Sequence, residues 1–153
     1  MPDGNVNKLS CRTVCQIGLV VRDVEKSARA YADLLGVDVP GWIITGPQRE
    51  TNSRYHDKPT DARAKLAFFQ MDNISIELIE PVDGPSTWQE FLDTKGEGVH
   101  HIAFHVEDMD GHVAMLGDKG MPLAQRGDFT GGGYAYIDSG KKLGVILELL
   151  ANY

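Results

Sequence analysis

The sequence lacks most features that mark secreted, membrane or nucleic-acid-binding proteins. It has only two cysteines, Cys11 and Cys15, which lie beside the first expected strand, where reduced thiols are easier to place than a strained disulfide. Its 22 acidic residues exceed its 15 Lys and Arg residues, so it has no excess of the positive charge that attracts nucleic acid or anionic lipid. We therefore expect no nucleic-acid partner and a small molecule instead.

Long apolar runs are also missing. No stretch approaches the roughly 20 apolar residues that span a bilayer, and the opening MPDGNVNKLSCR lacks the apolar core of a signal peptide. We therefore expect a soluble cytoplasmic protein with no membrane partner. The chain of 153 residues is 42% hydrophobic and 24% charged, which favours one compact domain with its own core.

The first half predicts a strand, a helix and a hairpin. The strand is the β-branched run Val14–Val21, and Asp23 is a good N-cap for the helix that follows and ends at Gly36. Segments 66–71 and 74–80 predict two antiparallel strands joined by a tight turn. Between them and the helix, the polar segment 39–64 predicts strand fragments and a long loop.

The second half repeats this pattern. Residues 101–121 can be laid over residues 16–36, with strand, Asp cap and helix in the same order, and a later strand pair places Glu148 where Glu77 stood. A Ser-x-x-Gln sequence after Pro85 predicts a short connecting helix. We therefore expect an α+β fold in which two tandem βαβββ modules form a curved mixed sheet around a shared cleft. The expected boundaries within a single domain of residues 1–153 are about 12–81 for the first module, 85–96 for the connector and 99–151 for the second module, with segment 39–64 covering the cleft.

Two glutamates occupy strands that have no polar face. Glu77 lies in ISIELIE and Glu148 in VILELLA, and a carboxylate buried in such a strand costs several kcal/mol unless it is neutralised. The repeat also makes Gln16 and His101 equivalent. One divalent cation facing two carboxylates, an amide and an imidazole would be nearly neutral overall. Each residue alone could be structural, but their symmetry predicts a metal site at Gln16, Glu77, His101 and Glu148.

Three segments carry a family resemblance: FFQMDNISIELIEP, GEGVHHIAFHVEDMD and GVILELL. From about Cys15 to Leu150 the chain resembles the vicinal-oxygen-chelate superfamily of glyoxalase I, methylmalonyl-CoA epimerase, extradiol dioxygenases and bleomycin-resistance proteins. The segments are most similar to methylmalonyl-CoA epimerase, whose metal ligands are His, Gln, His and Glu. The Gln, Glu, His, Glu order found here is similar instead to animal-type glyoxalase I. In both relatives the ligand precedes IAF, which implies His101, and strand alternation places His100 on the opposite face.

The resemblance implies proton transfer beside a carbonyl. A bound metal ion would stabilise an enolate or enediolate, with Glu148 as the base and Glu77 as the second acid. An epimerase or isomerase and a glyoxalase-type lyase both remain open, acting on a small carbonyl or thioester substrate. Zinc is the expected metal, and cobalt, nickel, manganese or magnesium would also suit the ligands. A homodimer is expected, since dimers are the commonest small oligomers.

The sequence constrains the substrate and any alternative function less than it constrains the fold. The positions that hold glutathione in animal-type glyoxalase I are Val20, Glu97 and Pro81 here, which argues against glutathione. Coenzyme A would find basic residues between positions 49 and 65, namely Arg49, Arg54, Lys58, Arg63 and Lys65. Gln16 in place of a His argues against an extradiol dioxygenase. The alternative from another class is a non-catalytic, antibiotic-type binding protein of the same fold.

Overall fold

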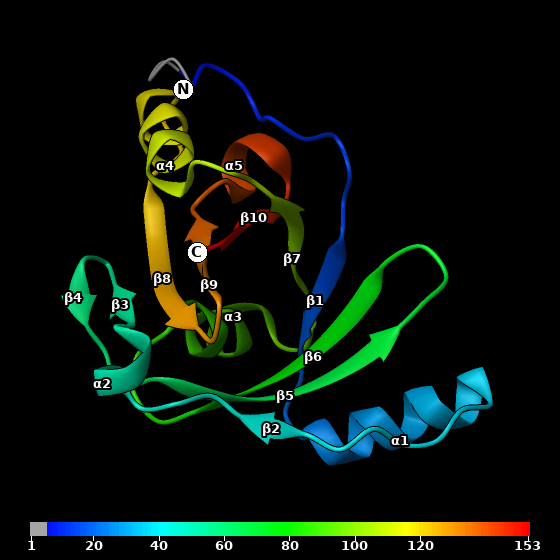
Figure 1. Ribbon diagram of the computed structural model, residues 1–153. Coiled ribbons are helices and arrows are strands. Elements are labelled where there is room, and N and C mark those ends of the chain that lie inside the picture. Colours follow the sequence, from blue (N-terminus) through cyan, green and yellow to red (C-terminus); the bar gives the residue numbers. More distant parts are fainter. Residues whose placement is uncertain (1–5) are drawn as a thin grey trace.

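The computed structural model of the protein describes residues 6–153. Within this range ten strands form one mixed sheet that curls into a half-barrel, in the order β2-β5-β6-β1-β7-β10-β9-β8-β3-β4 (Figure 1). The strands are β1 (Gln16–Val20), β2 (Ile43–Ile44), β3 (Arg54–Tyr55), β4 (Lys58–Pro59), β5 (Arg63–Gln70), β6 (Ser75–Val82), β7 (Gly98–His105), β8 (Leu123–Phe129), β9 (Gly132–Ile137) and β10 (Ile146–Asn152). The helices are α1 (Val24–Leu35), α2 (Gln48–Thr51), α3 (Thr87–Lys95), α4 (Met109–Asp118) and α5 (Gly140–Leu143). The expected α+β class is confirmed.

Strands β1 and β7 lie side by side at the centre of the sheet. They pair antiparallel with each other, while β1 pairs parallel with β6 and β7 pairs parallel with β10. Outside these pairs, β5 lies on β6 and β9 on β10, so the two halves of the sheet have matching strand orders. This arrangement agrees with the internal repeat in the sequence.

Helix α1 begins and ends as its sequence predicts. The Asp23 carboxylate accepts a hydrogen bond from the backbone N–H of Lys26 at 3.1 Å, and Gly36 ends the helix in the left-handed conformation, with a φ of 67°. Val24 and Ala28 are buried against the core beneath β5 and β6. The predicted helix is therefore confirmed, and it packs on the core through these residues.

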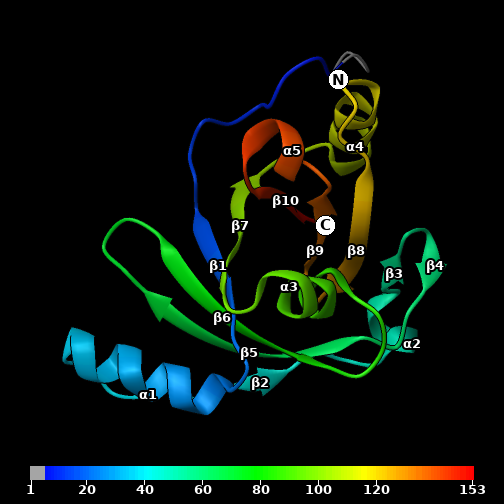
Figure 2. The same ribbon diagram turned by 180° about the vertical axis from the view of Figure 1, so that it is seen from behind.

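The connecting helix α3 and the second-half helix α4 also carry the expected caps. Ser86 accepts a hydrogen bond from the backbone N–H of Gln89 at 3.0 Å, although the Gln89 side chain donates to Asp93 instead of back to the cap. At the start of α4, Asp108 accepts from the backbone N–H of Gly111 at 2.9 Å. Figure 2 shows α3 between the β5–β6 pair and β9.

The segment 39–64 runs from one edge of the sheet to the other. Its strand β2 pairs with β5 at one end, and β3 pairs with β8 at the opposite end, where Arg54 faces Arg126 and Tyr55 faces Gln125. Figure 1 shows this cyan segment passing across the open side of the half-barrel. We call residues 39–64 the strap.

The turn between β5 and β6 and the state of the two cysteines agree with the sequence. Met71 N–H bonds to the carbonyl of Ile74 at 2.8 Å, which confirms the tight turn between β5 and β6. Cys11 and Cys15 are free thiols, as predicted. The short helix α5 leads into β10. None of the helices within residues 6–153 is long and apolar enough to cross a membrane.

Candidate functional site

Four adjacent strands carry the side chains predicted to bind a metal. These are Glu77 on β6, Gln16 on β1, His101 on β7 and Glu148 on β10. In the register of the sheet, Gly18 pairs with both Glu77 and His101. Likewise, Ala103 pairs with both Gln16 and Glu148. Two of the smallest residues therefore stand between the four polar ones, and this leaves room for their side chains to converge.

The four side chains meet at one atom, Nε2 of His101. It lies 3.0 Å from Oε1 of Gln16, 3.3 Å from Oε1 of Glu148 and 3.6 Å from Oε1 of Glu77. Two ligand atoms that are each about 2.1 Å from a tetrahedral ion lie about 3.4 Å apart. The three measured separations are therefore those expected between neighbouring ligand atoms of one ion.

The arrangement is nevertheless not a finished metal site. Within residues 6–153 no group of three or more His, Cys, Asp or Glu side chains is placed so that it could hold an ion as it stands. The oxygens gather around the imidazole nitrogen, which carries at most one proton and cannot satisfy three acceptors. Oε1 of Glu148 is buried and has no hydrogen-bond partner. The types of donor atom in the cluster, two carboxylates, an amide oxygen and an imidazole nitrogen, nevertheless suit a divalent ion.

Burial and mutual charge set the protonation of this cluster. Burial raises the pKa of Glu77 to about 8, the Glu148 charge adds to the rise, and His101 opposes it. Burial alone would lower the pKa of His101, but the nearby charges of Glu148 and Glu77 raise it. Without a metal, both Glu77 and His101 therefore hold a proton more tightly than they would in water. A metal ion must displace these protons to bind.

His100 contradicts the prediction made for it. The β1–β7 register shifts between Gly18 and Leu19, which face His101 and Val99, so His100 is the extra residue of a β-bulge. Instead of lying on the opposite face, its Nδ1 is 2.9 Å from Nδ1 of His101. Burial and the adjacent His101 charge lower the pKa of His100, which keeps it neutral. This contact fixes the orientation of the His101 ring, as partners of metal-binding histidines do.

The His101 ring lies directly over Gly18. A Cβ added at Gly18 would come within 2.0 Å of Cε1 and 2.5 Å of Nδ1 and Nε2 of that ring, so Gly18→Ala must displace it. We expect the substitution to weaken zinc binding by about 10- to 100-fold, measured by competition with a chelating dye. The control is Gly117→Ala in α4, where the added methyl meets nothing within 4 Å. A folded Gly18→Ala protein with unchanged affinity would contradict this placement of His101.

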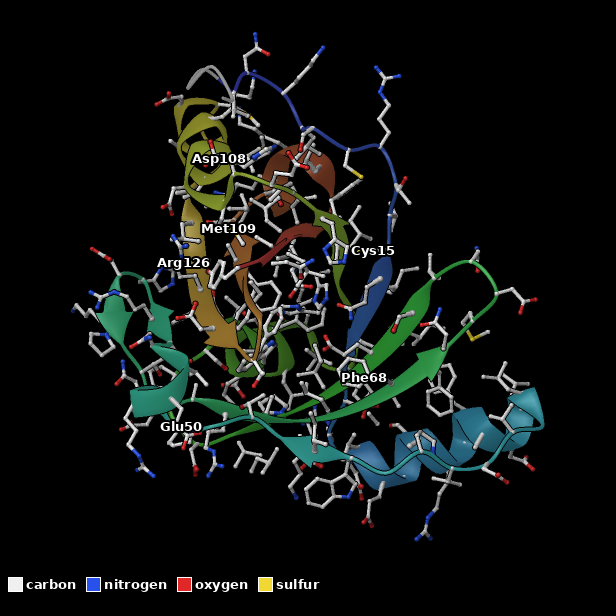
Figure 3. All side chains as sticks on the ribbon, viewed as in Figure 1. Cys15, Glu50, Phe68, Asp108, Met109 and Arg126 are labelled. Carbon is white, nitrogen blue, oxygen red and sulfur yellow. The ribbon has the colours of Figure 1, made fainter. Side chains whose placement is uncertain are left out.

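A cavity of about 660 Å³ lies over the cluster. Gln16, Glu77 and Glu148 form part of its wall, and apolar side chains such as Phe68 on β5 and Phe129 on β8 form much of the rest. The strap contributes the following wall residues: Ile43, Ile44, Thr45, Gly46, Glu50, Thr51 and Ser53. Figure 3 labels Glu50 on α2 and Phe68 on β5. The strap therefore encloses the cavity, as the sequence predicted.

The basic residues considered for coenzyme A do not line this cavity. Lys65 pairs with Glu80 at 3.3 Å, and Arg54 pairs with Asp57 at 3.4 Å. The Nε–H of Arg63 donates to the backbone carbonyl of Thr45 at 2.8 Å. These three side chains are therefore paired within the protein. A role of the basic residues in binding coenzyme A at the cavity mouth stays a prediction.

Comparison with known proteins agrees with this architecture. The family model of the glyoxalase/bleomycin resistance protein/dioxygenase superfamily matches residues 15–137. The chain is 27% identical over 136 residues to the uncharacterized protein YqjC of Bacillus subtilis, covering 87% of each chain. It is 31% identical over 94 residues to an ethylmalonyl-CoA/methylmalonyl-CoA epimerase of Cereibacter sphaeroides, covering 61% of this chain and 60% of that enzyme.

Among solved structures, methylmalonyl-CoA epimerase from Mycobacterium tuberculosis has the same fold. The TM-score is 0.63 at 23% identity, with 97% of this chain and 93% of that one covered. The family match covers parts of both halves of the sheet. It includes three of the four strands that carry the cluster, β1, β6 and β7, and ends before β10. The chain belongs to the glyoxalase/bleomycin resistance protein/dioxygenase superfamily.

Proposed function

We propose that this protein is a divalent-metal-dependent enzyme that transfers a proton at a carbon next to a carbonyl. The observation that carries the proposal is the meeting of two buried carboxylates and an amide oxygen at the His101 imidazole, beneath a largely apolar cavity. The metal would be held by Gln16, Glu77, His101 and Glu148. The reaction class is an epimerase or isomerase, or a glyoxalase-type lyase.

Each residue has a separate task in this proposal. The ion, when bound, acts as a Lewis acid on the substrate carbonyl. His101 is a neutral ligand whose ring is held by His100, and Gln16 contributes an uncharged oxygen. Glu148 faces the cavity and accepts the substrate proton, and Glu77 holds or returns a proton as the second acid. The apolar walls limit water, which strengthens the electrostatic interactions inside.

Two lines of support favour an enzyme. Buried carboxylates without a cation destabilise the folded protein. Their presence in two core strands therefore supports a role in binding a cation. The epimerase relative, whose name specifies acyl-CoA thioesters, shares 31% identity over the aligned region. We therefore propose a small carbonyl or thioester substrate and zinc as the first metal to test, followed by cobalt, nickel, manganese and magnesium. The homodimer and the cytoplasmic location stay predictions.

The test is metal-dependent hydrogen exchange. Protein freed of metal with a chelator and then loaded with each metal in turn is mixed in D₂O with methylmalonyl-CoA or with a hemithioacetal, and loss of the α-proton signal is followed by NMR. We expect exchange with about one equivalent of metal and none in the metal-free protein. Failure to bind any of the metals, or bound metal without exchange of either substrate, would contradict the proposal.

The alternative is a non-catalytic binding protein of the same fold. The observation that favours it is the cavity itself, because about 660 Å³ of mostly apolar space would suit a small-molecule ligand without chemistry. Such a protein would bind its ligand equally well with and without metal. Tight metal-independent ligand binding in a protein that shows no exchange would favour this alternative.

A further inference from the structure

We infer that the cavity selects a substrate whose metal-binding end is uncharged, and that it disfavours one ending in a carboxylate. This inference rests on the proposed function and narrows its substrate class. It comes from the balance of charged residues around the cavity. The proposed metal ligands alone would not predict it.

The cavity wall is acidic. Its carboxylic acids are Glu50, Glu77, Asp128 and Glu148, and no Lys or Arg of the described chain is among its lining residues. A divalent ion would be offset by Glu77 and Glu148, so it would present little net positive charge to a ligand. Glu50 and Asp128 remain as further negative charges. A carboxylate entering this space would lose its hydration without gaining a cationic partner, at a cost of several kcal/mol.

Three cationic side chains on strands that contribute to the cavity wall have partners within the protein. Arg126 on β8, labelled in Figure 3, lies two residues from Asp128 but holds Asp110 at 2.9 Å. Arg63 of the strap end donates to a backbone carbonyl, and Lys65 faces Glu80 across the hairpin. The charges of Arg126 and Lys65 are therefore already paired with carboxylates.

Neutral hydroxyl groups take the place of cations. The cavity wall includes the hydroxyl side chains Thr45, Thr51, Ser53, Thr130, Tyr134 and Tyr136. The hydroxyl oxygens of Tyr134 and Tyr136 accept hydrogen bonds from Nε2 of Gln125 at 2.9 Å and Nε1 of Trp88 at 3.1 Å, which leaves each O–H proton free to donate. Neutral donors of this kind suit carbonyl, amide or hydroxyl oxygens on a substrate. The chemical class implied is an uncharged chelating carbonyl compound, such as a hydroxy ketone, hemithioacetal or amide.

Glu77 is the main source of this selectivity between charged and uncharged substrates. Glu77→Gln removes one full negative charge beside the ion while keeping the shape of the side chain. That change would leave the metal centre with about one net positive charge, which could balance a carboxylate. The preference for uncharged substrates should therefore weaken in this variant.

The test uses two substrates that differ only in charge. One is the N-acetylcysteamine thioester of methylmalonate, and the other is the same thioester with its carboxylate converted to a primary amide. Binding to the zinc-loaded protein is measured by calorimetry at low salt, and α-proton exchange by NMR, with each rate divided by the uncatalysed rate. We expect the amide to be favoured by about tenfold or more in both affinity and corrected kcat/KM.

The variants test the origin of that preference. Glu77→Gln should reduce the ratio between amide and acid by about tenfold, and Glu50→Lys by about threefold because Glu50 is exposed to solvent. The matched control is Glu107→Lys, an exposed position outside the cavity, which should leave the ratio unchanged.

The outcomes separate this inference from the proposed function. Preferred binding and exchange of the acid would overturn the inference and leave proton-transfer catalysis intact. Preferred binding of the amide with no exchange of either compound would support the inference and overturn the catalysis. An unchanged ratio in Glu77→Gln that still binds zinc would overturn the assignment of selectivity to this residue.

Discussion

Glu148→Gln is expected to lower metal-dependent α-proton exchange by about 100- to 10,000-fold, the usual contribution of a general base. The side chain keeps its size and an oxygen that can approach the ion, but its amide cannot accept the substrate proton. Because Glu148 is 3% exposed and lies under the cavity, no solvent base can readily replace it. Exchange is measured by NMR in D₂O with the metal content of each sample determined in parallel.

Saturating zinc separates loss of the base from loss of the metal. Glu107→Gln, the same substitution at an exposed position, should retain full exchange activity. A Glu148→Gln protein that contains one zinc and exchanges protons at the wild-type rate would rule out Glu148 as the base. Activity lost only through loss of zinc, and restored by added zinc, would assign Glu148 a ligand role alone.

Glu77→Gln is expected to stabilise the metal-free protein at alkaline pH. The pKa of Glu77 is about 8 in the folded protein, against an ordinary value of 4.5, because the carboxylate is buried and lies near Glu148. The folded state thus holds this proton more tightly than the unfolded chain does. The contribution of Glu77 to stability is full below about pH 4.5 and is lost as the pH rises to about 8. Glutamine does not titrate, so the variant escapes this loss.

Denaturant unfolding in the presence of a chelator measures the effect. Between about pH 5 and about pH 8.5, the free energy of unfolding of Glu77→Gln should rise relative to wild type by an amount on the order of 2–4 kcal/mol. Zinc should reverse the order, since the wild type gains more from binding the ion. A difference that stays constant across this pH range would show that Glu77 does not keep its proton up to about pH 8 in the folded protein.

Much of the site could be predicted because it depends on strand alternation and on the repeat. A carboxylate within an apolar strand is visible in the sequence, and the repeat identifies Glu77 with Glu148 and Gln16 with His101. The structure shows why this works, since matching registers bring all four to adjacent strands. Local signals such as Asp23 and Gly36 also fixed the limits of α1.

What the sequence did not predict depends on nonlocal geometry. The bulge that turns His100 toward His101 has no local signal, because two adjacent histidines on a regular strand would face opposite ways. The pairing of β3 with β8 joins segments about 70 residues apart in sequence and has no distinctive motif. The need for glycine at position 18 also appears only when the His101 ring is seen above it.

The most direct test of the central claim is an anomalous-difference map at the zinc absorption edge, from crystals of protein loaded with one equivalent of zinc. We expect one peak about 2.0–2.2 Å from Oε1 of Gln16, Nε2 of His101 and a carboxylate oxygen of each of Glu77 and Glu148. A map with no peak there, or with zinc bound only at other residues while the two glutamates remain on His101, would contradict it.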